Sequence, residues 1–89
     1  MSDAASTGNT AFANASEEVK TLATKPSNTQ LLELYALFKQ GIFGDNTAER
    51  PGMFDIQGKA KWDAWTGKKG MSKEEAQAAY IALVESLKN

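Results

Sequence analysis

The chain has 89 residues, a formal net charge of −1, and neither histidine nor cysteine. This length fits one small domain without disulfides, and the missing residue types exclude Ser–His and Cys–His nucleophile pairs and the usual zinc ligands. A net charge near zero argues against nucleic acid as the main partner. Because the residues of common catalytic and metal sites are missing, we expect a binding protein rather than an enzyme, with no metal and no cofactor.

The first nine residues are polar and offer little to bury, so we expect residues 1–9 to form a disordered tail ahead of a domain over residues 10–89. The tail lacks the apolar stretch of a secretory signal. No run in the chain approaches the ~18 apolar residues of a membrane span. We therefore expect a cytoplasmic protein.

Apolar residues at three- and four-residue spacing predict two helices in the first half of the chain. The first begins near Thr10 and ends before Pro26, because proline disfavours helical geometry in the residue before it. The second follows a capping-box pattern formed by Ser27 and Gln30. It ends near Gly44.

Residues 44–57 contain turn signals and predict a long connection. We expect such a loop to be functional or packed by its own side chains, which Met53, Phe54 and Ile56 would supply. A short third helix over residues 59–65 follows.

Trp62 and Trp65 lie three residues apart in the third helix, and we interpret them as core anchors. A second capping box, from Ser72 to Glu75, starts a fourth helix that continues to about Leu87. No segment alternates like a strand, so the pattern predicts an all-α bundle.

Aromatic and basic side chains share one face of the second helix, where Tyr35, Phe38 and Lys39 are at i, i+3 and i+4. A ring can stack a nucleobase and a lysine can bind a phosphate. Lys61 beside Trp62, and Tyr80 on the last helix, extend this set. The same rings also continue apolar stripes and lone lysines are usually solvated, so an anion site and a plain helical core both remain open.

Two segments resemble the acyl-CoA-binding protein family: YALFKQ at residues 35–40 and ERPGMFDIQGKAKWDAW at residues 49–65. The similarity extends in order over about residues 10–88. It implies a four-helix, up-down-down-up bundle that binds the thioester of coenzyme A.

The resemblance also implies the roles of individual residues. Those that match the grip on the ribose 3′-phosphate are Tyr35, Lys39 and Lys61. Those that match other contacts are Phe38 (adenine stacking), Tyr80 (a ring on the nucleotide), Lys20 (near the phosphates), and Phe12, Val19 and Leu32 (near the acyl groove). The chain departs from the common family pattern at Phe38, where tyrosine is usual, and at Gln57, where lysine is frequent.

The implied function is a cytoplasmic, monomeric carrier that binds medium- to long-chain acyl-CoA esters one to one and maintains their pool for lipid metabolism. Its partners are the ligand itself and, transiently, acyl-CoA-using enzymes or membranes. One alternative is a protein-interaction module that docks a peptide on Tyr35 and Phe38. The other is a small acyl-CoA hydrolase, which the lack of histidine and cysteine disfavours.

Overall fold

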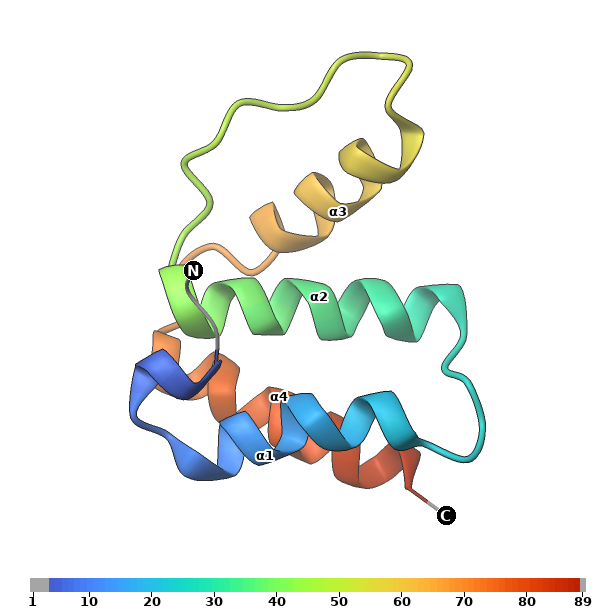
Figure 1. The fold of residues 1–89 in the computed structure, drawn as a ribbon. Coiled ribbons are helices and arrows are strands. Elements are labelled where there is room, and N and C mark those ends of the chain that lie inside the picture. The colour runs from blue at the N-terminus through green and yellow to red at the C-terminus, as the bar shows by residue number, and fades with distance from the viewer. Residues whose placement is uncertain (1–3, 89) are drawn as a thin grey trace.

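The structure, a computed structural model, describes residues 4–88, which form four α-helices and no strand. The elements in chain order are η1 (Ala4–Thr7, 3-10), α1 (Thr10–Glu18), η2 (Val19–Thr21, 3-10), α2 (Asn28–Phe43), α3 (Ile56–Thr66) and α4 (Lys73–Leu87). Helices α1 and α4 run in one direction and α2 and α3 in the opposite one (Figure 1). The predicted all-α, up-down-down-up bundle is therefore confirmed.

Helix α2 is the centre of the bundle. It packs against α4 on one side and against α3 on the other, while α1 packs on α4. Figure 1 accordingly shows α3 on the side of α2 that faces away from α1 and α4. In the described range, no helix combines the length and apolar character needed to cross a membrane.

Both predicted capping boxes are present. The backbone N–H of Gln30 donates to the Ser27 hydroxyl at 3.2 Å, and the backbone N–H of Ser27 donates to the Gln30 side chain at 2.9 Å. Ser72 and Glu75 make the same pair of hydrogen bonds, both at 3.0 Å. Each box satisfies backbone donors that have no partner within the helix, which fixes where α2 and α4 begin.

The first helix begins at Thr10 as predicted but is shorter than predicted. It ends at Glu18, and the chain continues through the 3-10 turn η2 to an extended Leu22. The hydroxyl of Thr21 donates to the carbonyl oxygen of Glu18 at 2.9 Å. This local bond competes with continued α-helical pairing, so the last turn tightens.

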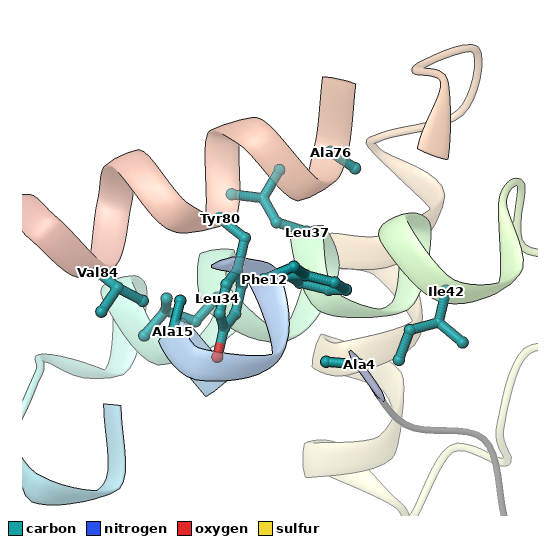
Figure 2. Close-up of a cluster of buried hydrophobic side chains, with 9 residues drawn as sticks. All are labelled: Ala4, Phe12, Ala15, Leu34, Leu37, Ile42, Ala76, Tyr80 and Val84. Atoms are coloured by element: carbon teal, nitrogen blue, oxygen red, sulfur yellow. The ribbon is translucent and has the colours of Figure 1, made fainter. Parts of the chain in front are cut away.

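The hydrophobic core lies among α1, α2 and α4, and its central side chains are Phe12, Leu37, Tyr80 and Val84 (Figure 2). Apolar spacing in the sequence predicts one stripe on each of two of these helices: Leu31, Leu34, Tyr35, Phe38 and Ile42 on α2, and Ala76, Ala79, Tyr80, Leu83 and Leu87 on α4. Leu37 and Val84 are buried although they lie off these stripes, whereas Tyr35, on the α2 stripe, is only partly buried. The difference arises because α2 contacts helices on two sides, so one helical face cannot describe its burial.

Residues 4–9 depart from the predicted disordered tail. Ala4 is only 2% exposed, and η1 packs on α1 and α2, with Ala4 near Ile42 (Figure 2). The hydroxyl of Thr7 closes the turn by donating to the Ala4 carbonyl at 2.7 Å. A small apolar side chain thus covers the end of the core, while residues 1–3 of the predicted tail lie outside the described range.

A polar network joins α2 to the neighbouring connections. The buried Gln40 amide donates to an Asp45 carboxylate oxygen at 2.9 Å and to the Met71 carbonyl at 2.7 Å. The same carboxylate oxygen accepts from the Gly70 backbone N–H, and these hydrogen bonds lower the pKa of Asp45. The loops on either side of α3 are therefore fixed to one point near the end of α2.

The long connection does not pack on its own side chains, so that prediction is wrong: Met53, Phe54 and Ile56 are exposed. The indole N–H of Trp62 instead donates to the Ala48 carbonyl at 2.8 Å, and that of Trp65 to the Gly44 carbonyl at 2.9 Å. No residue of α3 is buried. The two tryptophans are therefore half-buried supports of the loop and do not anchor the core.

Candidate functional site

Two open grooves lie along α2. The first, of about 440 Å³, runs between α2 and the segment from α1 to η2, and is lined by Ala4, Ser16, Glu17, Val19, Lys20, Leu31, Leu34, Tyr35, Phe38 and Tyr80. The second, of about 380 Å³, runs between α2 and α3, and is lined by Asn28, Leu31, Leu32, Ile56, Gln57, Ala60 and Lys61. Leu31 lines both grooves, so its side chain forms the ridge between them.

Two lysines from different helices meet at one aromatic ring. Lys39 Nζ, from α2, lies 5.7 Å from the centroid of the Tyr35 ring, and Lys61 Nζ, from α3, lies 5.5 Å from it. Among residues 4–88, no carboxylate forms an ion pair with either ammonium group. Two unpaired cations beside a phenol hydroxyl can bind a doubly charged phosphate.

Further aromatic rings surround the Lys39 ammonium. Its Nζ lies 5.0 Å from the Phe43 centroid and 5.9 Å from the Trp65 centroid, and these two rings are 6.0 Å apart. A cation over aromatic faces is attracted by their negative quadrupoles. The rings therefore hold the ammonium group in place. Among the described residues, none of its N–H donors is paired with a carboxylate.

The floor of the first groove is aromatic. The Phe38 ring lies 5.8 Å from the Tyr80 ring, and both line the groove. Burial raises the pKa of Tyr80 to about 12, so its hydroxyl is neutral at physiological pH and can donate a hydrogen bond. Burial also raises the pKa of Tyr35. Both phenols are therefore hydrogen-bond donors at the groove.

Phe12, which the resemblance places near the acyl groove, is not among the residues that line either groove. It is fully buried, 5.2 Å from the Tyr80 ring in an edge-on arrangement (Figure 2) and 5.6 Å from the Phe38 ring. The cause is its position at the start of α1, which faces α4 across the core. Phe12 therefore supports the rings that form the groove floor.

The remaining residues expected at the site are divided between the grooves. Val19 and Lys20 line the first groove, where Lys20 is exposed and pairs with Glu17 at 3.1 Å. Leu32 lines the second groove. Tyr35, Lys39 and Lys61 lie together between them, so the structure groups the expected residues around the central part of α2.

Sequence reasoning missed two rings beside Lys39. Phe43 lies four residues after Lys39 on α2, so helical spacing could have indicated this contact. Trp65 approaches Lys39 from α3, and no spacing pattern in the sequence links these two residues. The sequence predicts that Ile56 packs inside the long connection, whereas in the structure it lines the second groove.

The described residues contain no group of three or more His, Cys, Asp or Glu side chains placed to hold a metal ion. The candidate site consists of two part-apolar grooves that meet at Tyr35, Lys39 and Lys61, a cluster whose charges could bind an anion. Such an arrangement suits a ligand with a charged group, an aromatic ring and an apolar chain.

Comparisons with known proteins agree on one family. The family model "Acyl CoA binding protein" matches residues 9–84. "Acyl-CoA-binding protein homolog 1" of Caenorhabditis elegans is 64% identical over 85% of this chain and 88% of the relative, and the Drosophila melanogaster homolog is 53% identical over the same shares. The crystal structure of Oryza sativa Acyl-CoA-Binding Protein 2 superposes with a TM-score of 0.84, at 45% identity over 88% of this chain and 87% of that one.

Proposed function

The chain belongs to the acyl-CoA-binding protein family, and from this premise we propose that it binds medium- to long-chain acyl-CoA esters one to one. The observation that carries this proposal is the pair of ammonium groups, from α2 and α3, at the Tyr35 ring. The ribose 3′-phosphate is the most exposed double negative charge on coenzyme A. Lys39, Lys61 and the Tyr35 hydroxyl would bind its oxygens.

The two grooves then receive the two ends of the ligand. The adenine stacks on Phe38 in the first groove, which contributes about 1–3 kcal/mol. Tyr80 contacts the nucleotide from the groove floor, and Lys20 lies near its phosphates at the rim. Val19, which the resemblance puts near the acyl groove, lines this first groove, so we assign it to the nucleotide end of the ligand in this proposal.

The acyl chain lies along Leu31 and Leu32 in the second groove. Each methylene removed fully from water contributes about 0.8 kcal/mol. Longer chains therefore bind more tightly, while the anion-binding cluster decides which head group is accepted.

The biological role that fits such a site is a cytoplasmic carrier that acts as a monomer and has no catalytic step. It would keep long-chain acyl-CoA esters in a dispersed pool, out of micelles and bilayers, and deliver them to the enzymes of lipid metabolism. The bound ester is cargo, so we assign the protein no cofactor.

Calorimetric titration tests the proposal, with palmitoyl-CoA, free coenzyme A and palmitate measured in parallel. We expect one palmitoyl-CoA per chain, bound far more tightly than either fragment, because head and tail are recognised together. Equal binding or no binding of all three would overturn the proposal and favour a protein-interaction role.

Lysine variants test the assignment of the phosphate site. Lys39→Ala and Lys61→Ala should each weaken binding by roughly ten- to a hundredfold, since a charged hydrogen bond contributes about 1.5–3 kcal/mol, with little change in thermal stability. Lys88→Ala is the matched control, because Lys88 pairs with Glu18 and Glu85 away from both grooves. Equal effects of all three variants would disprove the assignment.

A further inference from the structure

Three large apolar side chains are exposed where the long connection enters α3. Met53, Phe54 and Ile56, together called the apolar tip, have exposures of 72%, 93% and 76%. Met53 and Phe54 are the central residues of a turn that the Asp55 N–H closes by donating to the Gly52 carbonyl at 3.0 Å. Contiguous apolar exposure of this kind marks an interaction surface more often than isolated residues do.

The turn that presents the apolar tip is held by hydrogen bonds. The Gly58 N–H donates to the Asp55 carboxylate at 2.9 Å, and the Trp62 indole fixes the preceding part of the loop at Ala48. The tip lies at the yellow end of an arch on the side of α2 that faces away from α1 and α4 (Figure 1). Its exposure is therefore built into the fold.

The charge next to the apolar tip differs from that of the whole chain. Residues 53–69, from the tip to the turn after α3, contain four lysines and two aspartates, a net charge of +2, whereas the full chain has −1. Arg50, three residues before Met53, pairs with Asp63, and Lys68 pairs with Glu33. Lys59 and Lys61 form no ion pair among the described residues, which leaves positive charge beside the tip.

We propose that the apolar tip docks on an anionic lipid bilayer, with Met53, Phe54 and Ile56 in the interfacial region and Lys59 at the headgroups. A convex turn with three protruding side chains suits a fluid phase that closes around each of them. A folded protein partner would instead need a matching depression for each side chain. Apolar insertion and attraction of lysines to anionic lipids act together at such surfaces.

Docking in this way would place one of the two grooves at the membrane. Ile56 belongs both to the apolar tip and to the lining of the second groove. An acyl chain could then pass between the bilayer and Leu32 along one apolar surface. This loading route rests on the proposed function, whereas docking itself needs no acyl-CoA.

Vesicle flotation of the full chain, without acyl-CoA, tests the docking. The vesicles contain phosphatidylcholine alone or an equal mixture of phosphatidylcholine and phosphatidylserine. We expect binding to the mixed vesicles that Phe54→Ser reduces by roughly tenfold or more, because an apolar side chain of this size dominates insertion. Phe54→Leu, which keeps an apolar side chain, should retain most binding, and Ala78→Ser on α4 is the surface control.

Three outcomes would overturn the docking proposal: no binding of the unchanged chain to mixed vesicles, equal binding of Phe54→Ser, or concentration-dependent dimers that Phe54→Ser abolishes without any vesicle binding.

Palmitoyl-CoA titration of Phe54→Ser in the absence of vesicles keeps the two proposals apart. Phe54 lines neither groove, so the affinity of Phe54→Ser for palmitoyl-CoA should equal that of the unchanged chain. Loss of palmitoyl-CoA binding by the unchanged chain, with docking intact, would overturn only the proposed function.

Discussion

At the scale of single residues, Lys39 has a more specialised environment than its charge alone requires. Three rings, from Tyr35, Phe43 and Trp65, lie within 6 Å of its Nζ. A flexible lysine loses side-chain entropy when it is fixed by a ligand. In the proposed complex, rings that fix the lysine beforehand would reduce that loss, so they would contribute to affinity without touching the phosphate.

Phe43→Leu tests this positioning role. It removes the ring nearest to the ammonium group, and we expect affinity for palmitoyl-CoA to fall about two- to fivefold, since an exposed cation–π contact contributes about 0.5–1 kcal/mol. The effect should disappear for the ester of 3′-dephospho-coenzyme A, whose binding does not use Lys39. A similar loss with both ligands in calorimetry would show that Phe43 acts on the groove as a whole.

The sequence indicated that the proposed phosphate-binding residues lie together better than it indicated the rings around them. Tyr35 and Lys39 are four residues apart on one helix, so local geometry places them together. Phe43 and Trp65 meet only because α3 packs on α2. The burial of Phe12 could not be predicted from the sequence either, because an aromatic residue suits a ligand groove and a core equally well and only the packing of α1 on α4 buries it.

At the scale of elements, the helix starts follow local chemistry and the other boundaries follow tertiary context. Ser27 and Ser72 form their capping boxes within four residues, and so α2 and α4 begin where the sequence predicted. Helix α3 begins earlier than predicted, because Asp55 caps it through the Gly58 N–H. The exposed tip at that start contradicts the simple expectation that large apolar residues in a loop fold inward.

Ser72→Ala tests the contribution of one cap. Loss of the hydroxyl leaves the Glu75 N–H without its acceptor, and we expect the free energy of unfolding to fall by about 1 kcal/mol. Urea denaturation followed by circular dichroism measures the change. Ser86→Ala, within the exposed part of α4, is the control and should be neutral or slightly stabilising, because alanine has the higher helix propensity. An equal loss of unfolding free energy in Ser86→Ala would show that the effect of Ser72→Ala does not come from the cap.

At the scale of the whole molecule, stability resides in α1, α2 and α4, whose buried side chains form one cluster around Phe12 and Tyr80. Tyr80 belongs both to this core and to the floor of the first groove. Its neutral hydroxyl is compatible with both positions. Ionisation would place a charge in the core, which links folding to alkaline pH.

The pH dependence of Tyr80 can be stated with its sign. Burial raises its pKa from 10.0 to about 12, so between these values the unfolded chain loses a proton that the folded chain keeps. The free energy of unfolding therefore falls as the pH rises through this window. Tyr80→Phe lacks the ionising group, so we expect its urea-denaturation midpoint to decline less steeply above pH 10 than that of the unchanged chain, and parallel declines would disprove the effect.

The absence of buried residues in α3 bears on how this protein can change through evolution. One wall of the second groove belongs to α2, the helix that also supplies Leu34 and Leu37 to the core, so substitutions that shift α2 would disturb both. The other wall, α3, contributes Ile56, Ala60 and Lys61 to the groove from a helix outside the core. With the acyl chain in this groove as proposed, mutations on α3 would alter the accepted chain length at little cost in folding, so we expect related proteins to diversify their ligand preference mainly through this helix.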